Sequence, residues 1–283
     1  MIDKRMTPKE AVDQLINDGD SICFGGWGST RKPMALIREI IRSKKKNLTF
    51  MAFGGLDIDI LIGAKKIKKL IFPFMSLEPA TGAPLNFRRA RKEAALNVME
   101  LSEHLFWQGL KAGAERLPFY PSRSGIGTDV LKINPQIKVI DAPYTGEKLV
   151  AMPALNPDVV ILHVNAADPS GWGQILGDPM FDSLMSRAGK KTILSAERVV
   201  PLSELKEDYG HIEIGRMWVN AVVEAPYGAH PGNCYPEYST VDEKHLAEYT
   251  KASGDPADFK AYLNKYVLKV PDNDAYVKLI GKV

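Results

Sequence analysis

One segment of the chain limits the possible folds more than any other. Residues 159–164 form an apolar run that contains a single histidine, His163. A run of this kind, without polar alternation, is typical of a strand buried on both faces in a parallel sheet. The same position favours the interpretation of His163 as a hydrogen-bonded core residue rather than a catalytic one.

Shorter strand patterns alternate with helical patterns along the rest of the chain. Thr7-Pro8-Lys9-Glu10 combines an N-cap residue, a first-turn proline and an acidic first turn, which predicts a helix, and Pro33 begins a second one. This alternation predicts an α/β fold with a mostly parallel sheet and helices on both faces. The predicted strands cover residues 21–24, 47–53, 69–74, 139–141, 149–152, 159–164, 192–195 and 219–223, and further helices cover 57–62, 103–115 and the tail from 244 to 282, whereas residues 88–98 fit a helix or a loop.

Length and composition narrow the function classes. The 283 residues fit a single domain, 1–283, with a helical tail at about 241–283. A net charge of +3 is too small to indicate nucleic-acid binding. No apolar window approaches the ~20 residues of a membrane span, and residues 1–15 lack the apolar core of a signal peptide, so we expect a cytoplasmic protein. Two cysteines and five scattered histidines predict no metal site.

Two glycine-rich turns are candidate ligand sites. Gly25-Gly26-Trp27-Gly28 follows a predicted strand and precedes a helix, where backbone N–H groups bind anions, and Arg31 and Lys32 follow at once. The pattern is not a dinucleotide-binding fingerprint, and a turn that only changes the chain direction is the alternative interpretation. The second turn, Ser124-Gly125-Ile126-Gly127-Thr128, is equally consistent with a plain loop.

Several polar residues stand near predicted element ends. Asn165, Asp168 and Ser170 follow the strand at 159–164, and Glu197 follows the strand at 192–195, at the strand ends where open α/β sheets bind ligands. Glu103 follows Ser102, and its ordinary interpretation is an acidic residue in a first helical turn. His230 lies in a segment that is expected to turn sharply. It is either a catalytic residue or a residue that stabilises the loop by hydrogen bonds. From the residues alone, the pattern predicts an α/β enzyme in which the glycine loops are candidate sites for an anionic ligand.

Four segments in the same order resemble the α subunit of class I coenzyme A transferases, nearest to the glutaconate CoA-transferase branch. The resemblance covers essentially the whole chain and implies the CoA-transferase (NagB/RpiA-like) fold. It also implies that CoA is part of the substrate rather than a permanently bound cofactor. A homologous β subunit is implied as partner, in an αβ or α2β2 enzyme, because the active site of the family lies between two homologous halves. The four segments are Gly25-Gly26-Trp27-Gly28-Ser29-Thr30-Arg31-Lys32-Pro33, Gly125-Ile126-Gly127-Thr128, Met152-Pro153-Ala154-Leu155 leading to His163, and Val222-Val223-Glu224-Ala225-Pro226-Tyr227-Gly228-Ala229-His230-Pro231.

Within this branch, two stretches resemble a group of steroid ring-cleaving CoA hydrolases. These are Gly26-Trp27-Gly28-Ser29 with the following Arg31-Lys32-Pro33-Met34, and Phe74-Met75-Ser76-Leu77-Glu78. The segment Met99-Glu100-Leu101-Ser102-Glu103-His104-Leu105 is similar to the segment that carries the essential glutamate of the hydrolase α subunit, at Glu103. The transferase branch has glutamine there. The resemblance thus implies Glu103 as the catalytic residue, and it implies these oxyanion or substrate-binding residues: Gly26, Trp27, Gly28, Ser29, Arg31, Ser76, Gly125 and Gly127.

Two functions follow from the resemblance. The first is ring-opening (retro-Claisen) hydrolysis of a cyclic keto acyl-CoA in steroid or alicyclic ring degradation, with Glu103 as general base. The second is CoA transfer between carboxylic acids through a glutamate of the partner β subunit, for which Glu103 is replaceable. A sugar-responsive regulator with the related fold needs a DNA-binding segment of ~50 residues before the first strand, but that strand begins near Ser21. An unrelated dinucleotide-binding enzyme is a further alternative, but the chain lacks the glycine fingerprint of that class.

Overall fold

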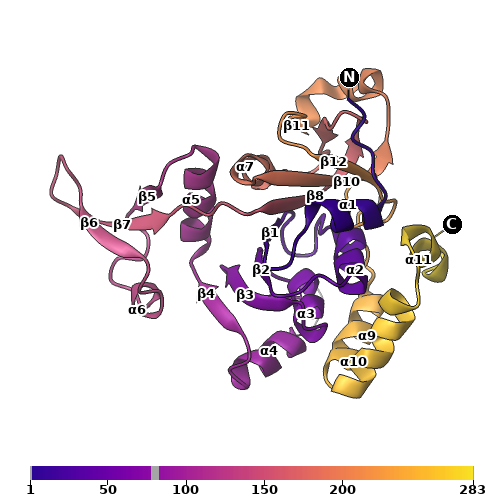
Figure 1. Ribbon diagram of the computed structural model, residues 1–283, viewed down its shortest axis with the longest axis horizontal. Coiled ribbons are helices and arrows are strands. Elements are labelled where there is room, and N and C mark those ends of the chain that lie inside the picture. Colours follow the sequence, from indigo (N-terminus) through magenta and orange to yellow (C-terminus); the bar gives the residue numbers. More distant parts are fainter. Residues whose placement is uncertain (1, 78–82, 283) are drawn as a thin grey trace.

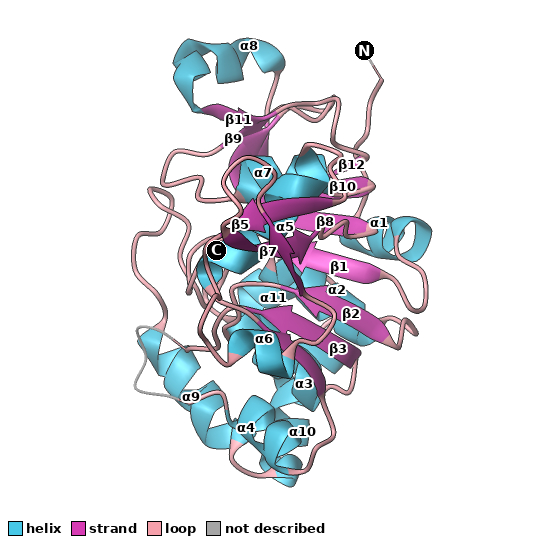
Figure 2. Ribbon diagram, turned by 90° about the vertical axis from the view of Figure 1, so that its left-hand side faces the viewer, coloured by secondary structure: helices cyan, strands magenta, loops and turns pink. Residues whose placement is uncertain are grey.

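The computed structural model describes residues 2–77 and 83–282. Its centre is a twisted, largely parallel sheet with helices on both faces (Figures 1 and 2). The parallel strands lie in the spatial order β12, β10, β8, β1, β2, β3, β4. Their bounds are β1 Ser21–Phe24, β2 Leu48–Met51, β3 Ile67–Phe72, β4 Asn97–Glu100, β8 Val159–Ala167, β10 Lys191–Val199 and β12 Ala221–Glu224.

Alternate side chains of the central strands enter two different hydrophobic cores, as the pleat of a strand requires. In β1, Ile22 and Phe24 join one core and Cys23 joins the other. In β8, Val160 and Ile161 divide in the same way. The first core packs against helices α1 Pro8–Leu15, α2 Met34–Arg42, α3 Leu56–Gly63, α4 Leu85–Lys92, α9 Glu243–Ser253, α10 Pro256–Leu263 and α11 Asn273–Leu279, and the second packs against α5 Glu103–Ala114 and α7 Asp182–Ala188.

The C-terminal helices pack against the first core, and buried polar contacts hold them in place. The Tyr249 hydroxyl of α9 donates to the buried Asp59 carboxylate of α3 at 2.5 Å. The Arg38 guanidinium of α2 lies 3.5 Å from the ring centroid of Tyr276 in α11, a cation–π contact. A π-helical turn, Asn264–Leu268, follows α10 directly. No helix in the described ranges is both long and apolar enough to cross a membrane.

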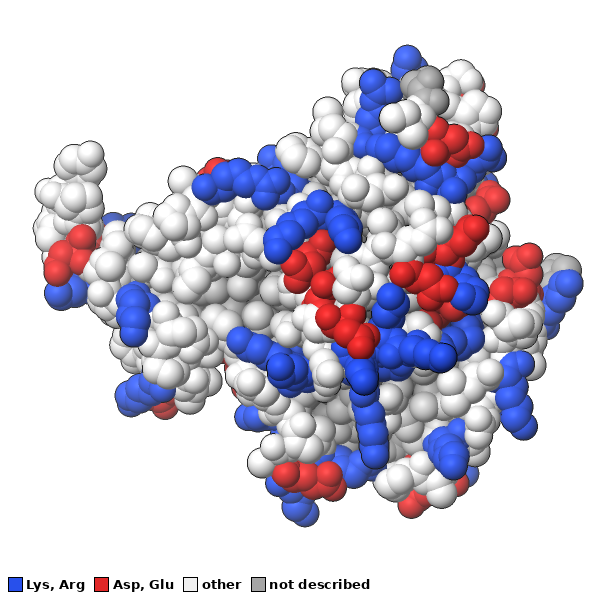
Figure 3. All heavy atoms as spheres, viewed as in Figure 1, with Lys and Arg blue, Asp and Glu red and all other residues white. Residues whose placement is uncertain are grey.

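A lobe projects from the sheet between α5 and β8, at the left of Figure 1. It contains an antiparallel three-stranded sheet in the order β5, β7, β6, and the short helix α6 (Val130–Ile133). Charged side chains of both signs are spread over the face in Figure 3, and broad uncharged areas remain on the lobe. The lobe strands are β5 Phe119–Ser122, β6 Lys138–Asp141 and β7 Lys148–Pro153.

The α/β prediction is confirmed, and so are the helix at Pro8 with its Thr7 capping box and the strand at 159–164, which extends to Ala167. Several features differ from the prediction, and β5, α6 and α7 are among the elements that were not predicted. Residues 88–98 contain the end of α4 and an additional parallel strand, β4. The strands at 139–141 and 149–152 pair antiparallel in the lobe instead of joining the main sheet. The short antiparallel strands β9 (Gly173–Gln174) and β11 (Ile212–Ile214), near helix α8 (Leu202–Leu205) and the 3-10 helix Lys206–His211, carry no sequence signal.

Candidate active site at the carboxyl edge of the sheet

Most of the predicted site residues lie in loops at one edge of the main sheet. Because β1, β2, β3 and β4 are parallel, the loops that follow them meet at the same carboxyl edge. Residues 25–33 follow β1, residues 52–55 follow β2, residues 73–77 follow β3, and Ser102 and Glu103 follow β4. This edge is where an open α/β sheet usually binds its ligand.

The first glycine loop is a tight turn that requires its glycines. Trp27 and Thr30 exchange two backbone hydrogen bonds, at 3.1 and 2.9 Å, which close the turn over Gly28. Gly26 and Gly28 have φ angles of +70° and +56°. A Cβ atom at Gly26 would lie 2.3 Å from the Thr30 carbonyl oxygen, so no other residue fits there without moving the turn.

Arg31 faces inward and fixes the glycine loop. Its guanidinium is 1% exposed and forms an ion pair with Asp182 of α7. It also donates to the Asp178 carbonyl at 2.7 Å. The other Asp182 oxygen, Oδ1, accepts the Gly26 N–H at 2.9 Å. The sequence pattern predicts that Arg31 meets an anionic ligand, but in this structure its side chain pairs with the internal Asp182 instead.

Lys32 is also directed into the protein. Its Nζ donates to the Phe53 carbonyl at 2.7 Å and lies 3.2 Å from the Asp57 carboxylate, and the side chain is almost fully buried. The two basic residues after the glycines therefore hold the loops together. No sequence signal reveals this, because the nearest acidic partners are 25 and 151 residues away along the chain.

Gly28, Trp27 and Ser76 are brought together at this edge. The Ser76 N–H donates to the Gly54 carbonyl at 3.0 Å. A Cβ atom at Gly55 would lie 3.1 Å from the Ser76 carbonyl oxygen and 3.3 Å from that of Gly28. The Trp27 ring packs edge-on against Phe74 at 5.6 Å. Glu78, quoted with Ser76 above, lies outside the described residues.

Ser29 joins the loop that follows β12. Its carbonyl oxygen accepts the Asn233 N–H at 3.0 Å, and a Cβ atom at Gly232 would lie 2.0 Å from it. The backbone of Ser29 is therefore held against residues 232–233. The structure places Ser29 as part of the loop's support.

Glu103 is the first residue of α5. Its predecessor Ser102 caps the helix by accepting the Leu105 N–H at 3.2 Å. The Glu103 side chain is exposed, and within residues 2–77 and 83–282 no hydrogen bond or ion pair involves its carboxylate. An exposed, unpaired carboxylate at a helix N-terminus is free to accept a proton from a ligand or a water molecule.

The second glycine loop lies beside Glu103. Ser124 Oγ is 3.1 Å from Ser102 Oγ. Gly125 has a φ angle of +93°, and a Cβ atom added there would lie 3.2 Å from the Leu105 side chain. Gly127 has φ +75° and is exposed, and no described atom lies within 4 Å of its added Cβ. Gly125, but not Gly127, is therefore in contact with the start of α5.

An aromatic cluster joins the two halves of this edge. Phe53 packs against Phe74 at 5.8 Å, against Phe106 of α5 at 5.1 Å and against Phe181 at 5.2 Å. Phe74 in turn contacts Trp27. The loop that carries Trp27 and the helix that begins with Glu103 thus share one apolar base.

A second polar cluster lies inside the sheet edge and was only partly foreseen. The Glu197 carboxylate pairs with His163 Nε2 at 2.6 Å, and it accepts bonds from the Tyr238 hydroxyl at 2.6 Å and from the backbone N–H groups of Tyr227 and Gly228. Burial raises the pKa of Glu197, but the bonds from His163 and its other donors outweigh burial and hold that pKa below its usual value. Glu197 and His163 are thus satisfied residues that fix the loop after β12, the core interpretation given to His163 above.

This cluster also contains the one described set of side chains whose spacing suits a metal ion. The donor atoms of His163, Glu197 and Cys234 lie within 4.8 Å of one another. Glu197 already accepts four hydrogen bonds, and burial raises the pKa of the Cys234 thiol, which keeps it protonated. Since a metal needs deprotonated sulfur and free carboxylate oxygens, these residues fit a hydrogen-bond network better than a metal site.

Comparison with known proteins places this arrangement in a family. The sequence profile described as "Coenzyme A transferase" matches residues 5–225. The chain is 38% identical over 274 residues to the cholesterol ring-cleaving hydrolase IpdA subunit of Rhodococcus jostii, covering 94% of this chain and 92% of that protein. It is 34% identical over 296 residues to one subunit of the glutaconate CoA-transferase of Acidaminococcus fermentans, covering 98% and 92%.

The fold agrees with these sequence relationships. The crystal structure of glutaconate coenzyme A-transferase from Acidaminococcus fermentans superposes with a TM-score of 0.93, at 32% sequence identity, over 98% of this chain and 93% of that one. The order of the parallel strands, the glycine loops at their carboxyl edge and the C-terminal helices therefore belong to a known architecture. The chain is a member of the coenzyme A transferase family.

Proposed function

We propose that this chain is the α subunit of a two-subunit enzyme that opens the ring of a cyclic keto acyl-CoA by hydrolysis, in steroid or alicyclic ring degradation. Its partner is a homologous β subunit, in an αβ or α2β2 assembly in the cytoplasm, and CoA enters as part of the substrate. The similarity to a cholesterol ring-cleaving hydrolase subunit supports this choice. The observation that carries it is the exposed carboxylate of Glu103, which has no partner in the described part of the chain.

Glu103 acts as the general base in this reaction. Its carboxylate takes a proton from a water molecule, whose oxygen attacks the ring ketone carbon and forms a tetrahedral alkoxide. The alkoxide collapses, and the bond to the carbon next to the thioester breaks. That electron pair becomes the thioester enolate, which takes the proton from Glu103 at carbon. The product has gained one water, as a new carboxylic acid, and keeps its thioester. A positioned base of this kind contributes ~10²–10⁴-fold to the rate.

The first glycine loop stabilises the alkoxide. The N–H groups of Gly26 and Trp27 are already bonded, to Asp182 and Thr30. Within the described residues the Gly28 N–H has no partner, and Gly28 lies at the tip of the turn. We assign this N–H as an oxyanion donor, a contribution of ~3 kcal/mol to the barrier for one such group.

CoA transfer between carboxylic acids is the second candidate, and the similarity to a glutaconate CoA-transferase favours it. A glutamate of the partner β subunit would then attack the thioester and carry the CoA as a glutamyl thioester. This chain would supply the acyl site and oxyanion donors, and Glu103 would be dispensable.

The test co-expresses this chain with its β subunit, as wild type, Glu103→Gln and Glu103→Ala, and compares the three complexes. Ring opening is followed by mass spectrometry with a cyclic 3-oxoacyl-CoA, and folding by circular dichroism and gel filtration. The proposal expects both variants to assemble and bind the thioester but to lose ring opening by at least 100-fold. Full activity in either folded variant would overturn the role of Glu103.

A further inference from the structure

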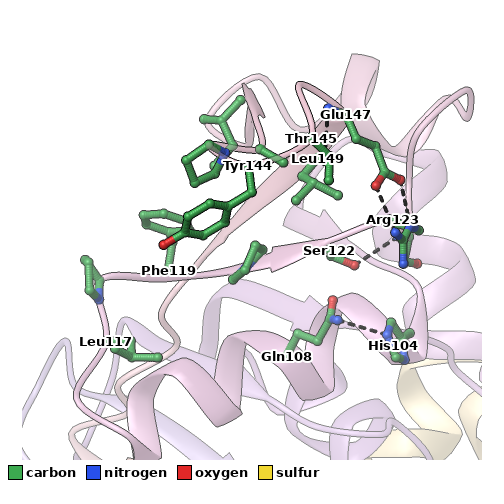
Figure 4. Close-up of a pocket in the computed structure, with 16 residues that line it drawn as sticks. His104, Gln108, Leu117, Phe119, Ser122, Arg123, Tyr144, Thr145, Glu147 and Leu149 are labelled. Atoms are coloured by element: carbon green, nitrogen blue, oxygen red, sulfur yellow. Dashed lines mark hydrogen bonds and ion pairs between the residues drawn. The ribbon is translucent and has the colours of Figure 1, made fainter.

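A groove in the lobe is lined by His104, the residue after Glu103. It has a volume of about 840 Å³ and lies between α5 and the sheet of the lobe (Figure 4). Its lining also includes Ser124, whose Oγ is 3.1 Å from Ser102 Oγ, so the groove lies close to the start of α5. A volume of this size lies in the range of small-molecule sites, ~300–1,000 Å³.

The groove wall is mainly apolar. Leu117 and Phe119 line one side, and Ile140, Ala142 and Leu149 of the hairpin between β6 and β7 line the other. Leu117 is 43% and Phe119 is 37% exposed, although residues of these types are usually buried. An apolar group bound in the groove would remove this surface from water.

One buried polar group faces the groove without a partner. Gln108 of α5 is 5% exposed, and its Oε1 atom has no hydrogen bond within the described residues. Figure 4 shows this oxygen pointing up from α5 toward β5, while the amide nitrogen points to His104. A buried, unpaired amide oxygen costs ~1–3 kcal/mol, so a ligand that bonds to it gains affinity and orientation.

The contact with His104 allows the Gln108 amide to present either end to a ligand. Gln108 Nε2 lies 2.9 Å from His104 Nε2, and the donor in this bond depends on the histidine tautomer. If the amide turns over, its oxygen accepts from His104 and its NH₂ group faces the groove. The site therefore suits a ring oxygen that is either a hydroxyl donor or a ketone acceptor.

We propose that this groove binds the ring of the acyl group, and that Gln108 bonds to an oxygen on that ring. This inference rests on the proposed function and adds its substrate class: a compact alicyclic acyl group with an oxygen substituent remote from the thioester. The acyl group extends from the Glu103 end of the groove along the apolar wall. The CoA part lies outside the groove.

The test measures binding rather than turnover, with three thioether analogues that cannot react: S-ethyl-CoA, S-(cyclohexylmethyl)-CoA and S-(4-hydroxycyclohexylmethyl)-CoA. Equilibrium dissociation constants are measured on the complex of this chain with its β subunit. Ala142→Trp fills the groove, and Val139→Trp is the matched control, because Val139 is 45% exposed on the same lobe and does not line the groove. Gln108→Met removes the polar group and keeps the side-chain length.

Wild type and Val139→Trp are expected to bind both cyclic analogues more tightly than S-ethyl-CoA. Ala142→Trp is expected to raise the dissociation constant of both cyclic analogues at least tenfold and to change that of S-ethyl-CoA less than twofold. Gln108→Met is expected to remove the advantage of the hydroxylated ring over S-(cyclohexylmethyl)-CoA.

Three results would overturn the inference. In the first, wild type binds S-ethyl-CoA and S-(4-hydroxycyclohexylmethyl)-CoA with equal affinity. In the second, Ala142→Trp weakens the binding of the cyclic analogues and of S-ethyl-CoA equally, or weakens the binding of neither. In the third, Ala142→Trp but not Val139→Trp loses the β subunit on gel filtration, which would make the groove a contact between subunits. If wild type binds no CoA thioether at all, the proposed function itself fails, whereas binding of S-ethyl-CoA alone refutes only the groove.

Discussion

Arg31 and Asp182 form an ion pair in which both side chains are 1% exposed, although they are 151 residues apart in the sequence. Asp182 also accepts the Gly26 N–H, and Arg31 also donates to the carbonyls of His163 and Asp178. The pair thus connects the first glycine loop to α7 and to β8. A loop that is fixed in this way before the substrate binds does not have to reorganise during the reaction.

Removing one charged partner of this ion pair is expected to destabilise the protein strongly. Asp182→Asn leaves the Arg31 charge buried without a counter-charge, which costs about 3–5 kcal/mol. We expect the melting temperature of the complex to fall by roughly 10 °C. The double variant Arg31→Met with Asp182→Leu should recover most of this loss, because both charges are gone. Asp208→Asn, at an exposed pair with His211, serves as the control. An unchanged melting temperature for Asp182→Asn would contradict the account.

Two buried histidines should make stability depend on pH. Burial lowers the pKa of His230 to about 4, and burial together with the nearby His230 charge lowers that of His245 to about 4, from an ordinary value of 6.5. Between pH 6.5 and pH 4 the unfolded chain therefore binds protons that the folded chain does not. The free energy of unfolding should fall as the pH drops through this window.

His230, in the loop after β12, joins α11 to the body, since its Nδ1 is 2.9 Å from the Tyr276 hydroxyl. His245 joins α9 to α10, since its Nε2 is 2.7 Å from the Tyr262 hydroxyl. Urea unfolding at several pH values should give a shallower acid-side slope for His230→Gln with His245→Gln than for wild type. His211→Gln, at an exposed position, should keep the wild-type slope. Equal slopes in all three proteins would refute the assignment.

The glycine at position 26 should be irreplaceable for activity. In Gly26→Ala the new Cβ meets the Thr30 carbonyl at 2.3 Å, so the turn that carries Gly28 must move. Gly146→Ala is a close control, since its φ is +69° and nothing described lies within 4 Å of an added Cβ. Both variants pay the cost of a left-handed alanine, about 1–2 kcal/mol. Turnover by the complex should fall at least tenfold only in Gly26→Ala, and equal turnover in the two variants would argue against a role for the turn.

The general-base role of Glu103 predicts a specific kinetic pattern. Glu103→Gln keeps the shape of the side chain but cannot take a proton from water, so kcat should fall by ~10²–10⁴-fold. KM for the thioester should stay within about threefold, because the exposed carboxylate binds no other group in the described structure. Steady-state kinetics with a cyclic 3-oxoacyl-CoA give both constants. A raised KM with unchanged kcat would assign Glu103 to binding instead.

Local sequence rules predicted the parts of the fold that depend on local physics. Thr7 and Glu10 form the expected reciprocal cap, and the apolar run at 159–164 forms the most buried strand. Strand β4 was missed because it lies at the sheet edge, where Asn97 and Glu100 remain exposed and no continuous apolar run is needed. The lobe strands have similar patterns to parallel strands, and only their pairing in space shows that they are antiparallel.

The candidate site was predictable only where a residue's role depends on its own loop. The glycine positions and the helix start at Glu103 could be located from the chain pattern. The inward direction of Arg31 could not, because its partner Asp182 comes from a distant helix. Gln108 gave no signal either, since an amide in the middle of an amphipathic helix is normally a solvent-facing residue.

The most direct test of the central claim follows oxygen from water. The complex of this chain with its β subunit is incubated in ¹⁸O-labelled water with a cyclic 3-oxoacyl-CoA and a deuterated acceptor acid, and the products are separated by mass spectrometry. The account predicts an opened ring whose new carboxylate carries one ¹⁸O atom, an intact thioester, no dependence on the acceptor, and no reaction with Glu103→Ala. Deuterated acyl-CoA with an unopened ring, formed equally well by Glu103→Ala, would show that the enzyme is a transferase and contradict the account.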